Sequence, residues 1–158
     1  MVVRPARSRD AKTLVQIARE SIEVTAGAHY DVPQRRVWLE GFTDDVLRAF
    51  IDDGQAFVAT SGSQTVGFAG LVDRLDGDGT LEYLYVRPAF TGRGVARRLV
   101  EAAEDAARAR SMPRLWVDAS WLARPVLEHL GYAVVETYQK QVRGVTFDNA
   151  WLRRSLLS

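Results

Sequence analysis

The sequence predicts an α+β fold, with a mixed, mostly antiparallel sheet of about seven strands flanked by about four helices. The spacing of hydrophobic residues changes along the chain and predicts the element order strand, two helices, three strands, helix, strand, helix, two strands. Three successive strands joined by short polar turns indicate an antiparallel meander, and a central strand–helix–strand unit requires one parallel pair with a right-handed crossover. The length of 158 residues suits one domain. We therefore expect residues 1–158 to form a single domain.

The amino-terminal part carries one short strand and two helical segments. Residues 2–4 are typical of a strand, and residues 10–26 repeat apolar side chains at helical spacing after polar residues that can cap a helix. Pro33 can open a second helix, whose apolar faces lie on either side of a break near Thr43 and Asp44. Both helical segments precede every long strand.

In the middle of the chain, apolar side chains recur with a period of two residues. Residues 56–59 and 66–72 predict two strands joined by a hairpin, and the turn at residues 76–79 leads into a strand over residues 81–86. Alternation along this last strand places four side chains on one face, namely Thr80, Glu82, Leu84 and Val86.

The carboxyl-terminal part alternates helices and strands. A helix begins near Gly92 and ends before Pro113, and a buried strand follows at residues 115–117. Gly131 stops a short helix over residues 122–130, and the last two strands cover residues 132–141 and 145 to about 152. The strands on either side of the Gly92 helix are expected to be parallel neighbours.

Composition excludes several kinds of chemistry. The chain has no cysteine, which removes disulfides, zinc-thiolate sites, iron–sulfur clusters and cysteine nucleophiles, and its two histidines leave little for a metal site. With a net charge of +1, the chain lacks the overall basic character of a nucleic-acid-binding protein. All basic residues except Lys12 and Lys140 are arginines, which reflects either codon usage or phosphate recognition. We expect no metal and no nucleic-acid partner.

The amino-terminal segment lacks the apolar stretch of a signal peptide, and no window approaches the ~18 apolar residues of a membrane-spanning helix. The sequence therefore predicts a cytoplasmic protein with no membrane partner. No motif sets the oligomeric state, and a homodimer is left open.

A glycine turn between a strand and a helix is the most informative segment. Small residues stand at positions 92, 94 and 96, where they let the backbone approach a ligand, and the first amides of the helix form an anion site. No G-K-[ST] follows, and Arg97 stands where a dinucleotide fingerprint needs its third glycine. The alternative is an ordinary tight turn with a glycine-rich helix start.

The turn resembles the signature of the GNAT superfamily of acyl-CoA-dependent N-acyltransferases, (Q/R)-x-x-G-x-(G/A). Gly94 and Ala96 match its second half, whereas Thr91 replaces the usual Gln or Arg. Residues 123–132 resemble a second motif of a bacterial branch, A-R-P-x-x-E-x-x-G-[FY], and the hairpin near residues 141–149 is similar to that branch's tail. Tyr30, Gln34 and Trp38 also fit the branch, so the resemblance covers nearly the whole chain.

The resemblance implies that strands four and five splay apart and that acetyl-CoA, as acyl donor, enters the gap. Its pyrophosphate would contact the first amides of the Gly92 helix, and its pantetheine would run beside the fourth strand. The implied cofactor-binding residues are Leu84, Tyr85, Val86, Thr91, Gly92, Arg93, Gly94, Val95, Ala96, Arg97 and Ser120. Arg87, Arg93, Arg97 and Arg98 flank this site, although each could equally be a solvated surface arginine.

Acetyl transfer to an amine requires a base, because an alkylammonium has a pKa near ~10. Glu82 is the candidate base, and its alternative role is an ion pair with a neighbouring arginine. A backbone N–H near Leu84 or Tyr85 could polarise the thioester carbonyl. The resemblance implies an acceptor wall with Glu82 and the loop residues His29 and Tyr30, to which Trp38 adds an aromatic surface. Tyr30 is also a weaker catalytic candidate, and ordinary packing is the alternative for the His-Tyr pair.

The usual acid of the family is missing. Many members place a tyrosine in the second motif to protonate the leaving thiolate, and Leu127 occupies that position here. Ser120 could donate a hydrogen bond to the pantetheine or to the sulfur, and water or direct thiolate release are further routes.

The leading hypothesis is an N-acetyltransferase that moves an acetyl group from acetyl-CoA to a primary amine on a small molecule by direct attack. One alternative is an acyl-CoA-binding sensor with little turnover, which Leu127 and Thr91 favour. Another is a protein or peptide N-acetyltransferase, which would require an open groove.

Overall fold

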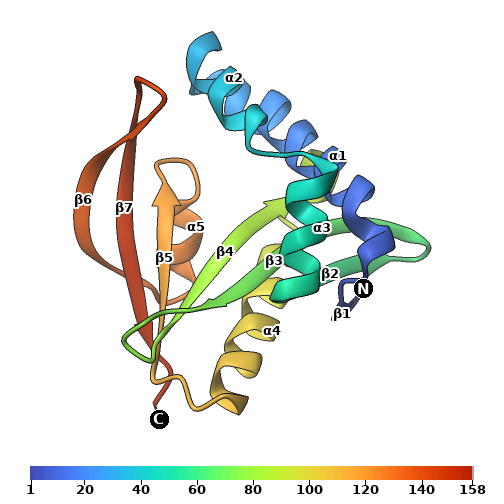
Figure 1. Ribbon diagram of the computed structural model, residues 1–158, viewed down its shortest axis with the longest axis vertical. Coiled ribbons are helices and arrows are strands. Elements are labelled where there is room, and N and C mark those ends of the chain that lie inside the picture. Colours follow the sequence, from blue (N-terminus) through green and yellow to red (C-terminus); the bar gives the residue numbers. More distant parts are fainter. Residues whose placement is uncertain (158) are drawn as a thin grey trace.

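The computed structural model of the protein describes residues 1–157, which form one seven-stranded sheet with the order β1-β2-β3-β4-β5-β7-β6 (Figure 1). Neighbouring strands are antiparallel except for the parallel pair β4 and β5, as the sequence predicts. The strands are β1 (Val2–Pro5), β2 (Gln55–Ser61), β3 (Gln64–Asp73), β4 (Gly79–Val86), β5 (Arg114–Ser120), β6 (Ala133–Val142) and β7 (Val145–Ser155). β7 extends beyond its predicted end because Ser155 still pairs with Arg114 of β5.

Residues 1–157 contain five α-helices, one more than the sequence predicts. They are α1 (Ala11–Glu20), α2 (Val32–Glu40), α3 (Asp44–Asp53), α4 (Val95–Ala109) and α5 (Arg124–His129). The break expected near Thr43 separates α2 from α3, because the Thr43 hydroxyl accepts a hydrogen bond from the Val46 N–H and starts a new helix. α1 continues as a π-helix, Ser21–Thr25. None of the helices in these residues combines the length and apolar character that crossing a membrane requires.

Helices cover both faces of the amino-terminal half of the sheet (Figure 1). On one face, α1 and α3 bury Leu14, Ile17 and Leu47 against Val58 and Phe68. On the other, α4 buries its apolar stripe against β3, β4 and β5. Amphipathic helices and alternating strands thus build two apolar clusters that hold β4 between them.

A β-bulge at Tyr83 interrupts β4. Gly70 of β3 pairs with Glu82 and Ala69 pairs with Leu84, so Tyr83 is the extra residue, with a φ of +52°. Leu84 and Val86 pack with Leu81 on the α4 side, whereas Glu82 alternates to the opposite side. The expectation that Glu82 shares a face with Leu84 and Val86 is therefore wrong, because the extra residue resets the alternation.

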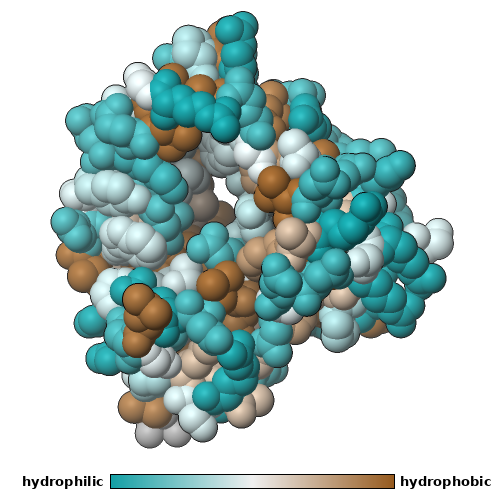
Figure 2. All heavy atoms as spheres, in the orientation of Figure 1, coloured by the Kyte–Doolittle hydropathy of each residue, from teal (hydrophilic) through white to brown (hydrophobic). Residues whose placement is uncertain are grey.

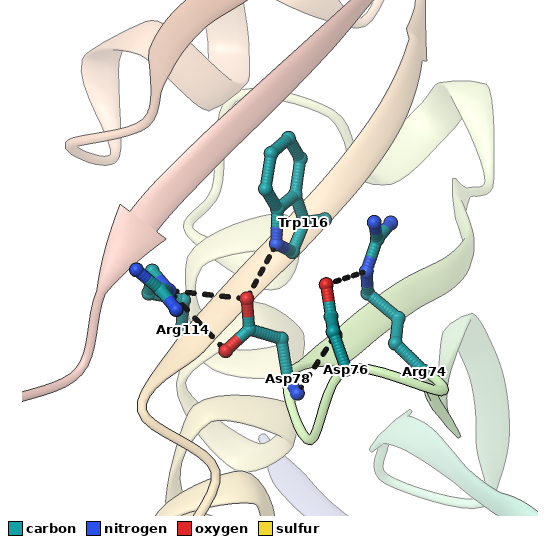
Figure 3. Close-up of polar contacts among 5 residues, drawn as sticks. All are labelled: Arg74, Asp76, Asp78, Arg114 and Trp116. Atoms are coloured by element: carbon teal, nitrogen blue, oxygen red, sulfur yellow. Dashed lines mark hydrogen bonds and ion pairs between the residues drawn. The ribbon is translucent and has the colours of Figure 1, made fainter.

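β4 and β5 pair only at their first residues. Gly79 pairs with Leu115 and Thr80 with Trp116, after which the strands diverge, as Figure 1 shows. A buried carboxylate fastens the paired end: the Asp78 side chain accepts hydrogen bonds from Trp116 Nε1 at 2.8 Å and from Arg114 Nε at 3.0 Å (Figure 3). The divergence of β4 and β5 confirms the predicted splay. The Asp78 contacts hold the two strands together at the end where they still pair.

Candidate active site

The gap between β4 and β5 opens into a cavity of about 810 Å³. Its lining comes from β4, β5, the start of α4 and α5, and on the opposite side from the π-helix, α2 and the β6–β7 pair. Figure 2 shows a hollow in this face of the molecule, with hydrophobic atoms along part of its border. The strand divergence thus creates a cavity between the two halves of the sheet that is open to solvent.

The glycine turn forms one end of this cavity. Gly92 and Gly94 have φ angles of +75° and +82°, and a Cβ built on either would meet no atom within 4 Å. Gly94 is the N-cap of α4, so the amides of the first turn have no partner within the helix. The left-handed backbone favours glycine here, the open space leaves room for a ligand, and the free amides give this end a partial positive charge.

The arginines near the turn have different roles. Arg97 lines the cavity together with Thr91, Val95 and Ala96, whereas Arg93 is not among the lining residues and places its guanidinium over the Phe90 ring at 5.1 Å. Arg87 turns away, because its Nη1 pairs with Glu20 at 2.7 Å and its Nε donates to the Thr65 carbonyl. Arg98 is not a lining residue either.

The second half of β4 runs along the middle of the cavity. Leu84, Tyr85 and Val86 all line it. Their backbone pairs with β3 on one side, but within residues 1–157 no strand pairs with the β5-facing edge beyond Thr80. An extended ligand could therefore hydrogen-bond to this edge as an added strand would.

Glu82 lies in the cavity just before the bulge. Its side chain keeps solvent contact, yet the surrounding protein raises the pKa of its carboxyl, mainly by desolvation. Asp118 raises this pKa further, and Lys140 opposes the shift. Within residues 1–157 the carboxylate accepts no side-chain hydrogen bond, so it is free to take a proton from a ligand. Its alternative role as an arginine partner is not seen in this part of the chain.

A polar network lies across the gap from Glu82. Asp118 on β5 accepts hydrogen bonds from Asn149 Nδ2 at 2.9 Å, the Tyr138 hydroxyl at 2.8 Å and Lys140 Nζ at 3.0 Å. Desolvation and the neighbouring Asp118 raise the pKa of Tyr138, which keeps it a donor. The sequence prediction missed this network, because the donors come from β6 and β7 and meet Asp118 only through strand register.

The side of the cavity opposite the glycine turn has aromatic walls. Trp38 lines it and donates from Nε1 to the Tyr85 hydroxyl at 2.8 Å, and burial raises the pKa of Tyr85. Tyr30 and His29 are not lining residues. Tyr30 is buried against Trp38 and Phe147 at ring distances of 5.2 and 6.2 Å, and its hydroxyl has no hydrogen-bond partner within residues 1–157. His29 packs on Trp121 at 5.4 Å.

Ser120 and Leu127, of which Leu127 occupies the position of the family's usual proton donor, both line the cavity. Ser120 Oγ accepts a hydrogen bond from the Ala123 N–H at 3.1 Å, so its hydroxyl proton remains available to a ligand. Leu127 is 1% exposed and belongs to the apolar core, which excludes proton donation from that position. Among residues 1–157, no group of three or more acidic, His or Cys side chains could hold a metal ion.

A family model described as "Acetyltransferase (GNAT) domain" matches residues 14–149. The chain belongs to the GNAT acetyltransferase family. It is accordingly an acyltransferase, an N-acetyltransferase by class, and the fold described above is that of a GNAT protein.

Individual relatives agree with the GNAT assignment. The protein is 28% identical to the uncharacterized N-acetyltransferase YafP of Escherichia coli over 96% of this chain and 93% of YafP. A GCN5-related N-acetyltransferase structure from Rhodopseudomonas palustris, also described as aminotransferase class-II, superposes with a TM-score of 0.89 at 28% identity, over 98% of this chain and 94% of that one. PaiA N-acetyltransferase of Thermoplasma acidophilum, solved with coenzyme A, has a TM-score of 0.81 at 19% identity and covers 98% of both chains.

Proposed function

We propose that this protein transfers an acetyl group from acetyl-CoA to a primary amine on a small molecule by direct attack. The observation that carries the proposal is the cavity itself, which joins the free amides of the α4 turn to the Glu82 carboxylate through the gap between β4 and β5. A donor that is anionic at one end and reactive at the other fits such a path.

The residues present suit a coenzyme A thioester. The open space beside Gly92 and Gly94 and the first amides of α4 could hold the pyrophosphate, with Arg97 as a nearby cation. The unpaired edge of β4 could hold the pantetheine, whose amides match backbone groups. PaiA, which shares the fold, was solved with coenzyme A, and this also supports the assignment.

In the proposed reaction, the ammonium of the acceptor gives one proton to Glu82, whose raised pKa makes it a stronger base than a fully solvated carboxylate. The amine nitrogen then forms a bond to the thioester carbonyl carbon, the carbon–sulfur bond breaks, and the sulfur takes the electron pair. The nitrogen loses its second proton, the thiolate gains one, and the products are an N-acetylamine and a free thiol. A backbone N–H of β4 near Leu84 could hold the oxyanion.

Ser120 is the proposed contact for the leaving sulfur. Its oxygen is occupied as acceptor by the Ala123 N–H, which orients the hydroxyl so that it can donate toward the cavity. Leu127 supplies no proton, so water or Ser120 would support the departing thiolate.

A small acceptor is favoured over a protein or peptide. Gln34 Nε2 of α2 donates to the Thr146 carbonyl of β7 at 3.0 Å, and Arg143 pairs with Glu40. These contacts tie α2 to the β6–β7 hairpin beside the cavity and restrict the passage of an extended chain.

Binding of acetyl-CoA is tested by thermal unfolding. At a concentration 100-fold above Kd the ligand should add about 2.7 kcal/mol, or roughly 5–10 °C in Tm for a chain of this size. Gly94→Glu should abolish the shift by placing a carboxylate where phosphates would lie. Gly62→Glu is the matched control, because Gly62 also has a positive φ and open space but lies in the β2–β3 turn. An unshifted wild type, or equal shifts in both variants, would contradict the proposal.

The base is tested by the pH profile of thiol release. Glu82→Gln should lower kcat/KM near neutral pH by about 100-fold or more and recover partly at high pH, where the amine is already deprotonated. Glu101→Gln, on the exposed face of α4, should leave the profile unchanged. A Glu82→Gln profile that parallels the wild type would remove Glu82 from the mechanism. Tight acetyl-CoA binding without amine-dependent release would favour the sensor alternative, for which Leu127 is the supporting residue.

A further inference from the structure

The acceptor half of the cavity, between the π-helix, α2 and the β6–β7 pair, has few charges. Apart from Arg97 at the glycine turn, the charged lining residues in the described part of the chain are Glu82, Asp118 and Lys140. Lys140 Nζ lies 3.0 Å from Asp118 Oδ2, so these two charges largely compensate each other. The net charge beside the proposed reaction centre is therefore −1, and Glu82 carries the uncompensated part.

Most of the remaining wall of this half is apolar, and its polar groups include the neutral side chains of Ser21 and Thr25 on the π-helix. Ile22, Val37, Phe42, Val142 and Phe147 contribute hydrocarbon surface, and Trp38 contributes its ring. The only polar atom of the Trp38 side chain, Nε1, is already used by the Tyr85 hydroxyl. Both Asp118 oxygens are likewise occupied by Asn149, Tyr138 and Lys140. Within the described residues, the wall thus offers no further uncompensated charge to a second charged group on an acceptor.

We propose that the acceptor is a monoamine with one positive charge and an apolar, preferably aromatic, body, and that Lys140 sets this charge selectivity. The inference rests on the proposed acetyl transfer. One ammonium balances the single net negative charge and delivers its proton to Glu82. A second ammonium would be desolvated without a partner, because Lys140 already neutralises Asp118. A carboxylate beside the amine would face the uncompensated negative charge of Glu82.

Lys140 is well placed for this role without being part of the reaction. Its side chain is 44% exposed, so replacing it should leave the fold intact, and it contacts Asp118 rather than Glu82. Removing its charge would change the net charge of the site from −1 to −2. A dication should then be accepted better relative to a monocation of the same length.

The test is thiol release from acetyl-CoA with four acceptors: 2-phenylethylamine, hexylamine, 1,6-diaminohexane and phenylalanine. For the wild type, we expect kcat/KM to be highest for 2-phenylethylamine and at least about tenfold lower for the diamine and for phenylalanine. In Lys140→Met, the ratio of diaminohexane to hexylamine should rise about tenfold, the order expected for one added charge in a partly desolvated site. The ratio cancels any effect of Lys140 on the pKa of Glu82.

Lys12→Met is the matched control, because Lys12 is exposed on α1 and is the only other lysine of the chain. Its ratios should equal those of the wild type. A wild type that prefers the diamine or phenylalanine, or a ratio that Lys140→Met leaves unchanged, would overturn this inference while leaving acetyl transfer intact. Absence of thiol release with every amine would instead overturn the proposed function, and this inference with it.

Discussion

Replacing Asp78 with alanine should destabilise the protein by about 3 kcal/mol. The Asp78 side chain is 2% exposed and holds the Trp116 indole at 2.8 Å and the Arg114 guanidinium at 3.0 Å (Figure 3). A hydrogen bond to a charged group contributes about 1.5–3 kcal/mol. The Trp116 bond should contribute near the top of this range. The Arg114 bond should contribute less, because Arg114 is 47% exposed and regains water.

Urea unfolding followed by circular dichroism measures this loss, and a thermal scan should show Tm lower by roughly 6–12 °C. Asp73→Ala is the matched control on the same hairpin. Asp73 lies 2.6 Å from Arg110, but its side chain is 62% exposed. An exposed ion pair contributes about 0–1 kcal/mol, so this variant should be nearly neutral. Equal losses in the two variants would refute the argument that burial of Asp78 makes the difference.

Two further changes test the neighbourhood of Glu82. Gly70→Ala should lower the free energy of unfolding in urea by about 1–3 kcal/mol and should lower kcat, because its Cβ would lie 2.4 Å from the Phe50 ring, which packs on Tyr83 at the bulge. Gly27→Ala is the control, because the space around its Cβ is open. Equal stability of the two variants would contradict the packing argument. Glu82→Gln should be more stable than the wild type near pH 8, because folding raises the pKa of the Glu82 carboxyl and the wild-type protein therefore loses stability as the pH rises through that pKa. The difference in stability should shrink toward pH 4. A difference that does not depend on pH would argue against desolvation of Glu82.

Local sequence signals were sufficient for the starts of two helices that border the cavity. The capping box of Asp31 and Gln34 with Pro33 starts α2, and glycines 92 and 94 mark the start of α4. Each signal acts within one or two turns of chain, where capping and backbone freedom decide the structure. The turn and the parallel β4–β5 pair could therefore be predicted from residues close in sequence, whereas the expectation that Leu84 to Val86 lie beside a ligand came from the family resemblance.

The acceptor side could not be predicted in the same way. Nothing in the residues around Tyr83 signals a positive φ, and the bulge depends on packing against Phe50, Phe42 and Phe68 from other elements. Asp118 and Lys140 lie 22 positions apart and meet only because β5 and β6 both flank β7. Tyr30, which the family resemblance placed in the acceptor wall, is buried against Trp38 and is not a lining residue. Non-local packing thus determines which polar groups face the cavity.

Leucine at position 127 is compatible with turnover because the two proton transfers differ in difficulty. An alkylammonium with a pKa near ~10 remains protonated at neutral pH, so the attacking nitrogen needs a base. A thiol has a pKa near ~8.5, so its thiolate can leave and gain a proton from water at modest cost. In the proposed mechanism, a site with a partly desolvated Glu82 and a core leucine at the acid position therefore retains catalysis of the harder transfer. Leu127 instead contributes to the apolar cluster that it shares with residues of α4 and β5.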